Sequence, residues 1–144
     1  SITRVRPRLT PRARAPVSPS VRASKAQADQ IRAAVCGQTD VDLAWYPDGT
    51  YRAWFSGLRP LGGYSIMWPW VAEEGLPVVM PLLADPATKA LVVVEDYTVW
   101  DQYDTKEYLK PLLDYVKANY ADLGNGWYLS PAAAAGCPQP ASGG

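Results

Sequence analysis

The stretch "LVVVEDYTVW", residues 91–100, is the strongest strand signal in the chain. It contains three consecutive valines, whose branched side chains favour the pleated surface of a β-sheet. We therefore expect a buried strand here.

The segment that follows, "YDTKEYLKPLLDYVKANYADLGNG" (103–126), predicts an amphipathic helix. Pro111 decides where it begins, because a proline costs about 3 kcal/mol in a helix interior but is tolerated in the first turn. We expect the helix to begin near Lys110, after a separate turn capped by Asp104, and to end at Gly124. Its apolar side chains recur at helical spacing: Leu109, Leu112, Leu113, Val116, Tyr120 and Leu123.

The clearest local signal in the chain is "VDLAWYPDGTYRAWFSG" (41–57). Two aromatic-rich runs flank a turn in which Pro47 and Asp48 are favoured residues and Gly49 would supply a positive φ. This pattern predicts a β-hairpin.

Three shorter segments are also interpreted as extended. "YSIMWPW" (64–70) predicts a strand that ends at Pro69, and "GWYLSP" (126–131) predicts a last short strand. "LPVVMPLLA" (76–84) predicts an edge strand or an irregular extended segment, because its two prolines cannot donate to a sheet.

Residues 64–84 form the most apolar region and have about the length that spans a bilayer. Glu73, Glu74 and three prolines interrupt the region, and charges and missing backbone donors are costly in lipid. We expect no membrane span.

These elements predict an α+β fold: a small, mostly antiparallel sheet of about four to five strands packed by one amphipathic helix. An extended N-terminal arm and a C-terminal tail lie outside it. The expected boundaries are an arm at 1–23, a short helix at 24–37, a single body at 38–130 and an Ala/Pro/Gly tail at 131–144.

Opposite charges are separated along the chain although its net charge is zero. Residues 1–35 carry eight bases and one acid, a net +7, and the remainder carries six bases and thirteen acids, a net −7. The basic block favours an anionic partner surface, and the acidic block favours a cationic one.

The first 23 residues predict an arm that binds a partner. Prolines at positions 7, 11, 16 and 19 favour an extended, polyproline-like conformation. The composition also resembles that of a transit peptide, but Ser1 is what remains when an initiator Met is removed, so we expect a native amino terminus. The predicted partner-binding arginines are Arg4, Arg6, Arg8, Arg12, Arg14 and Arg22.

Few residues suit catalysis or metal binding. Histidine, the commonest general base and metal ligand, is absent. The adjacent acid pairs Glu73–Glu74 and Glu95–Asp96 point to opposite faces if they lie on strands. We expect no catalytic residue, no metal site and no cofactor.

Cys36 and Cys137 lie at the two borders of the predicted body. They are either two unpaired thiols or a disulfide, within one chain or between subunits. A disulfide within the chain would tether both termini and close a long loop.

Six Trp and nine Tyr against one Phe indicate either an interface, since amphipathic rings anchor protein contacts, or a small core built from these rings. The predicted aromatic anchors, placed on an exposed sheet face, are Trp45, Tyr51, Trp54, Trp68 and Trp70.

The leading hypothesis is a non-enzymatic structural subunit whose basic arm links it to neighbouring copies in a large assembly. The expected location is the virion of a bacteriophage, as a capsid decoration, head-completion, neck or tail protein. The alternatives are an accessory protein of a ribonucleoprotein such as the ribosome, whose arm binds RNA, and a peripheral subunit of an organelle membrane complex.

Overall fold

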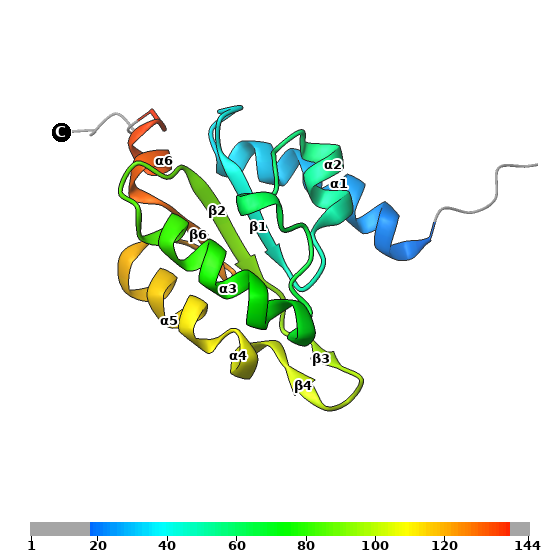
Figure 1. Cartoon of the computed structure of the whole chain (residues 1–144). Coiled ribbons are helices and arrows are strands. Elements are labelled where there is room, and N and C mark those ends of the chain that lie inside the picture. The colour runs from blue at the N-terminus through cyan, green and yellow to red at the C-terminus, as the bar shows by residue number, and fades with distance from the viewer. Residues whose placement is uncertain (1–17, 139–144) are drawn as a thin grey trace, which may run out of the picture.

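The computed structural model describes residues 18–138, which form an α+β fold around a mixed four-stranded sheet (Figure 1). The α+β prediction is thus confirmed, although this part of the chain holds six α-helices where one was expected to pack the sheet. In chain order the elements are α1 (Pro19–Ala34), β1 (Asp42–Tyr46), α2 (Thr50–Ser56), η1 (Leu61–Gly63), α3 (Pro69–Ala84), β2 (Ala90–Val94), β3 (Thr98–Val99), β4 (Tyr103–Asp104), α4 (Thr105–Tyr108), α5 (Lys110–Asn119), β5 (Ala121–Gly124), β6 (Trp127–Leu129) and α6 (Pro131–Ala135).

The strand predicted at 91–100 is confirmed in its first part as β2, which ends at Val94 and has a neighbour on each side. The strand order is β1-β2-β6-β5. Leu91 of β2 pairs with Leu43 of the parallel strand β1 and with Leu129 of the antiparallel strand β6. A parallel pair needs a long crossover connection, and the chain between β1 and β2 supplies one that contains α2 and α3.

Helices cover both faces of the sheet at β1 and β2, whereas the edge strand β5 is exposed (Figure 1). The prediction that aromatic anchors lie on an exposed sheet face is wrong, because Trp45 is buried and the other four lie on α2 or at the start of α3. An uninterrupted run of valines suits a strand that is buried on both sides. On one face of the sheet, α3 and α5 pack against Ala44, Tyr46, Ala90 and Val92. On the other face, α1, α2 and α6 pack against Leu43, Trp45, Leu91 and Val93.

Residues 41–57 do not form the predicted β-hairpin. The chain leaves β1 through a turn in which the Asp48 carboxylate accepts a hydrogen bond from the Thr50 amide at 3.0 Å, and then forms α2. Gly49 has φ −110°, so it does not supply the expected positive φ. Glycine is needed for another reason: a Cβ there would lie 2.6 Å from the Trp45 carbonyl oxygen.

The strands predicted at 64–70 and 76–84 are also wrong, because residues 69–84 form α3. Pro69 is the first residue of this helix, where a missing amide costs nothing. Pro77 and Pro81 lie inside it and are exposed. The carbonyls that they leave unpaired, four residues earlier in each case, can therefore be hydrated.

The prediction for the start of α5 is confirmed. The helix begins at Lys110 with Pro111 in its first turn, and the Asp104 carboxylate caps α4 by accepting from the Lys106 amide at 2.9 Å. Its end was predicted five residues too late, at Gly124, because residues 121–124 form β5. The last predicted strand is confirmed as β6.

Both ends of the folded region extend further than predicted. The first helix begins at Pro19 instead of Ser24, and the Ser18 side chain accepts a hydrogen bond from the Val21 amide at 3.4 Å. At the other end, residues 131–135 of the predicted tail form α6. In the described part of the chain, every helix is too short or too polar to cross a membrane.

Candidate functional site

The predicted arm residues fall mostly outside the described part of the chain. Arg22 lies within it, exposed on α1. The five that lie outside residues 18–138 are Arg4, Arg6, Arg8, Arg12 and Arg14.

Trp45 is a core residue, so its prediction as a partner-binding anchor is wrong. Only 3% of it is exposed. Its indole N–H donates to the Glu95 carboxylate at 2.6 Å, the Arg52 guanidinium lies 4.6 Å from its ring, and Trp127 packs edge-on at 5.3 Å. Alternation on β1 could show which face Trp45 occupies, but not that α1 and α2 cover that face.

The other predicted anchors form two separate groups. Tyr51 and Trp54 lie on α2, where Trp54 is 80% exposed and Tyr51 stacks on Phe55 at 6.4 Å between ring centroids. Trp68 and Trp70 lie at the start of α3. The second group has further aromatic neighbours from the β3–β4 hairpin.

Three nearly parallel indoles, Trp68, Trp70 and Trp100, form an array that we call the aromatic ladder. Trp70 stacks on Trp68 at 6.1 Å between ring centroids and on Trp100 at 4.9 Å, with interplanar angles of 18° and 19°. Tyr97 packs against the Trp68 ring at 6.5 Å. Trp70 is 53% and Trp100 73% exposed, so the ladder presents a large apolar surface to solvent.

The β3–β4 hairpin holds Trp100 over α3. Val99 and Tyr103 pair across the hairpin, and Trp100 and Asp101 occupy its turn with φ of +53° each. Such a backbone conformation costs an aromatic residue about 1–3 kcal/mol and persists only where the surroundings impose it. The buried Thr105 side chain anchors the base of the hairpin, because its hydroxyl donates to the Glu95 carbonyl at 2.6 Å.

Sequence reasoning missed the contribution of Trp100, Tyr97 and Tyr103. All of "LVVVEDYTVW" (91–100) was interpreted as one strand, whereas β2 ends at Val94. No glycine or asparagine marks the turn, so residue preferences give no sign of it. The one available signal was the density of aromatic residues between 97 and 103.

A groove of about 420 Å³ borders the ladder and is lined by side chains from α3 and the hairpin. We call it the ladder groove. Its lining consists of Pro69, Trp70, Trp100 and Tyr103, and it is aromatic or aliphatic apart from the Tyr103 hydroxyl and the indole N–H groups.

The surroundings of the groove are acidic. Residues 68–76 and 95–104, the segments that contain its four lining residues, hold six acids and no base. Glu73 and Glu74 share a helix face with Trp70, because residues three and four apart are neighbours on a helix. Four of the six form no ion pair with any residue from 18 to 138: Glu73, Glu74, Asp101 and Asp104.

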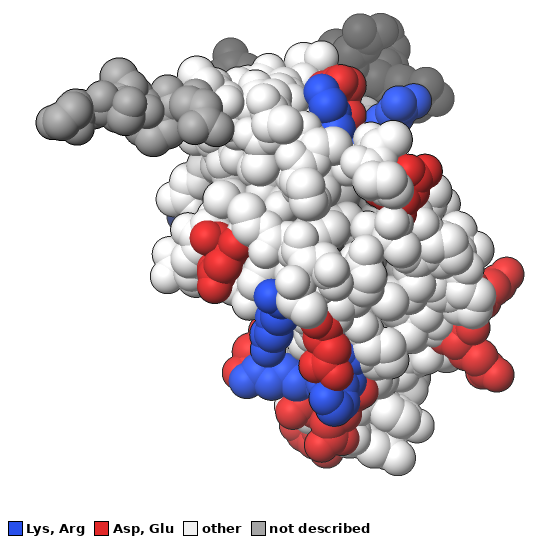
Figure 2. All heavy atoms as spheres, turned by 90° about the vertical axis from the view of Figure 1, so that its left-hand side faces the viewer, with Lys and Arg blue, Asp and Glu red and all other residues white. Residues whose placement is uncertain are grey.

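The acids near the hairpin other than Asp101 are occupied. Asp96 pairs with Lys106 at 3.0 Å and raises the pKa of that lysine, and Asp104 caps α4. Glu95 pairs with Arg52 at 3.3 Å. Figure 2 shows charges of both signs gathered at the end of the molecule where α4 and the hairpin lie, below a broad uncharged surface.

The outer side of α3 extends the apolar surface away from the ladder. Helices of soluble proteins normally carry polar residues on the side that faces away from the core. Beyond Glu74, however, the exposed positions of α3 are apolar: Pro77, Val78, Pro81 and Ala84.

A second hollow, of about 560 Å³, lies between α1 and the β5–β6 turn. It offers one aromatic ring and no acid, base or nucleophile, which leaves it without groups for chemistry or charge recognition. Its lining consists of Gln30, Ala33, Ala34, Leu123, Gly124, Asn125 and Trp127.

Comparisons of the chain with protein-family models, curated proteins and solved structures yield no match. Across residues 18–138, no three histidine, cysteine, aspartate or glutamate side chains converge on a position that could hold a metal ion.

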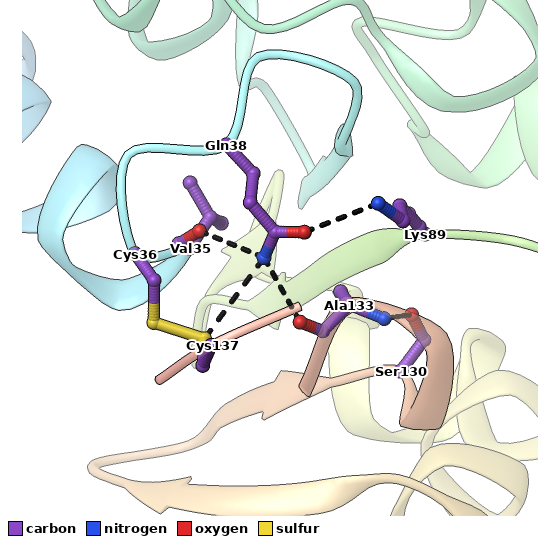
Figure 3. Close-up of a disulfide and its surroundings, with 7 residues drawn as sticks. All are labelled: Val35, Cys36, Gln38, Lys89, Ser130, Ala133 and Cys137. Carbon is purple, nitrogen blue, oxygen red and sulfur yellow. Dashed lines mark hydrogen bonds between the residues drawn. A yellow bond between two sulfur atoms is a disulfide. The ribbon is translucent and has the colours of Figure 1, made fainter. Parts of the chain in front are cut away.

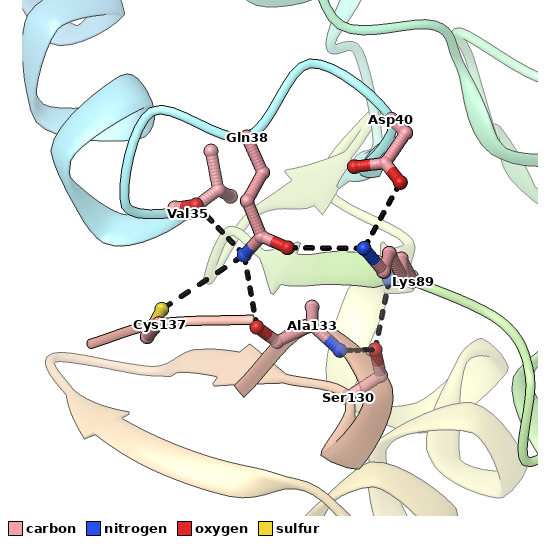
Figure 4. A network of polar contacts seen from close by, with 8 residues as sticks. Val35, Gln38, Asp40, Lys89, Ser130, Ala133 and Cys137 are labelled. Carbon is pink, nitrogen blue, oxygen red and sulfur yellow. Dashed lines mark hydrogen bonds and ion pairs between the residues drawn. The ribbon is translucent and has the colours of Figure 1, made fainter. Parts of the chain in front are cut away.

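The two cysteines form a disulfide within the chain, the pairing that the sequence left open (Figure 3). It joins the residue after the C-cap of α1 to the segment after α6. Nearby, the Gln38 amide donates to the carbonyls of Val35 at 3.0 Å and Ala133 at 2.9 Å (Figure 4). Lys89 donates to Gln38 and to Asp40, and this lowers the pKa of Asp40. These contacts join the end of α1 to α6.

Proposed function

We propose that the chain is a non-enzymatic structural subunit that associates with other copies of itself through the aromatic ladder and the adjoining outer side of α3. The observation that carries the proposal is the exposure of Trp70 and Trp100 in a stacked array. Large exposed apolar patches mark interaction sites, and tryptophan is among the residues that contribute most to protein interfaces.

The charges favour a protein over a nucleic acid as the ligand of this surface. Single-stranded nucleic acids stack their bases on aromatic side chains, but they do so in grooves that are positively charged. The two segments that supply the groove lining contain six acids, of which only Glu95 and Asp96 have a basic partner, and residues 18–138 carry nine bases against fourteen acids. Phosphates would be repelled here. Binding of RNA by the arginines outside the described residues stays a prediction.

The setting also remains a prediction. A virion is built from many copies of small subunits, and links between neighbouring copies would suit such a particle. Neither the ladder nor its charges distinguishes a virion from another assembly of repeated subunits.

Sedimentation velocity of the full chain tests the proposal. We expect concentration-dependent association of the wild type and a weakening of at least about 30-fold in Trp100→Ala, since truncation of a central interface tryptophan costs about 2 kcal/mol or more. Trp54→Ala is the matched control, because Trp54 is equally exposed but lies on α2. Circular dichroism verifies that both variants are folded.

Two outcomes would contradict the proposal. The wild type could remain monomeric at every concentration, or Trp100→Ala could associate as tightly as Trp54→Ala. In the second case the ladder would not be the contact surface.

A further inference from the structure

We infer that the ladder groove binds the arginine- and proline-rich segment of residues 1–17 from a second copy of the chain. The inference rests on the proposed function and names the ligand of the same surface. It follows from the chemistry of the groove and from the composition of the part of the chain that lies outside the described residues.

The groove defines the ligand that it can bind. Its lining of Pro69, Trp70, Trp100 and Tyr103 offers flat apolar surfaces to a ligand that packs against rings. The unpaired carboxylates of Glu73, Glu74 and Asp101 add negative charge at its border. A ligand that matches both features is cationic, rich in rigid apolar groups and free of acids.

Residues 1–17 have this composition. They contain five arginines, three prolines and no acid, a net +5 that equals in magnitude the net −5 of the other 127 residues. An arginine guanidinium stacks on indole faces and pairs with carboxylates. Proline-rich segments bind aromatic grooves, because their restricted backbone loses little conformational entropy on binding. Each feature of the groove thus has a counterpart in the segment.

The position of α1 favours a second copy over the same molecule. The segment enters the fold at Ser18, the N-cap of α1, and α1 packs on the face of the sheet opposite to α3 (Figure 1). Binding within one molecule would leave the chain monomeric, so the oligomeric state distinguishes the two cases.

The test mixes two full-length variants, each of which should lose self-association because a different half of the contact is altered. The segment variant carries Arg6→Gln, Arg8→Gln and Arg12→Gln, and the groove variant carries Trp100→Ala. We expect self-association of the segment variant to weaken at least about tenfold, since hydrogen bonds to charged groups are among the strongest in proteins. For the groove variant we expect at least about 30-fold. A 1:1 mixture should form a heterodimer, because the groove variant supplies an intact segment and the segment variant an intact groove.

Two controls accompany the mixture. The first is a charge-matched variant in which three exposed bases of the folded region, Lys25, Arg59 and Lys117, are replaced by Gln; it should associate like the wild type. The second is salt: a higher salt concentration should weaken association of the wild type, since exposed charges are screened.

The outcomes separate this inference from the proposed function. If Trp100→Ala abolishes association and the segment variant does not, the ladder binds another part of the second copy; the proposed function stands and the inference is wrong. If the mixture forms no heterodimer, the segment does not bind the groove of a second copy. If the wild type is monomeric, both are wrong.

A synthetic peptide of residues 1–17 gives an independent readout. We expect it to change the tryptophan fluorescence of the full chain and to compete with self-association, and to do neither with Trp100→Ala. A response to a single-stranded RNA or a neutral oligosaccharide, without a response to the peptide, would overturn the inference.

Discussion

Replacement of both cysteines by serine, Cys36→Ser with Cys137→Ser, should strongly destabilise the fold. The disulfide joins residues 101 positions apart, so it closes almost the whole described region into one loop. For a loop of about 100 residues the chain-entropy relation gives about 4.7 kcal/mol of stabilisation at 25 °C. Domains of this size have a total stability of about 5–15 kcal/mol. The bond therefore accounts for a large part of the free energy of unfolding.

Urea unfolding monitored by tryptophan fluorescence measures this effect. The double variant should lose about 3–5 kcal/mol relative to the oxidised wild type. The Gln38 hydrogen bond to the Ala133 carbonyl still holds α6 in the variant, so the native state should remain populated in water. Reductant should shift the wild type towards the variant and leave the variant unchanged. A difference below about 1 kcal/mol would refute the argument, because the loop-closure entropy would then be offset by residual structure in the unfolded chain.

Three further predictions concern the turn after β1 and the buried tyrosines. Gly49→Ala should lower the free energy of unfolding by about 1–3 kcal/mol in a urea titration, because the added methyl group would overlap the backbone and Cβ of Trp45. Tyr46→Phe should raise it by about 1 kcal/mol, since the Tyr46 hydroxyl is buried without a hydrogen-bond partner among the described residues. Burial raises the pKa of Tyr46, Tyr108 and Tyr120, that of Tyr108 to about 12. A folded-state pKa above the unfolded value of 10.0 means that the stability contributed by the neutral phenols is complete below pH 10 and is lost as the pH rises through the folded-state pKa. The urea midpoint should therefore fall above pH 10. In a spectrophotometric titration, three tyrosinate absorbances should appear at higher pH than the others.

Each of these has an outcome that would contradict it. An unchanged stability of Gly49→Ala would show that the turn shifts at little cost. A loss of stability in Tyr46→Phe would show that the hydroxyl has a partner in solution. Titration of all nine tyrosines near pH 10 would show that the three phenols are not buried.

The aromatic ladder shows which part of a site local sequence can reveal. Trp68 and Trp70 were identified because tryptophan is common at interfaces, and that preference does not depend on the fold. Trp100 was missed and Trp45 was wrongly included, because the exposure of each depends on which distant helices cover it. Residue type alone cannot distinguish an exposed tryptophan from a buried one that has found a partner for its N–H, as Trp45 has in Glu95.

The amino-acid sequence alone determined the features that depend on neighbouring residues. The valines of β2, Pro111 at the start of α5 and the Asp104 cap were all predicted correctly, since branching, a missing amide and a capping carboxylate act within a few residues. The separation of charge along the chain is likewise a property of the sequence.

Only the tertiary structure decided the elements whose local preferences were weak or contradictory. The aromatic segment of α2 and the proline-containing α3 have local patterns that favour strands, yet both are helices because the parallel pairing of β1 with β2 requires a crossover that also covers the sheet. The disulfide and the stacking of Trp70 on Trp100 also join residues far apart in the chain. Such contacts depend on packing that forms only when the whole domain folds, and for this reason no local pattern predicts them.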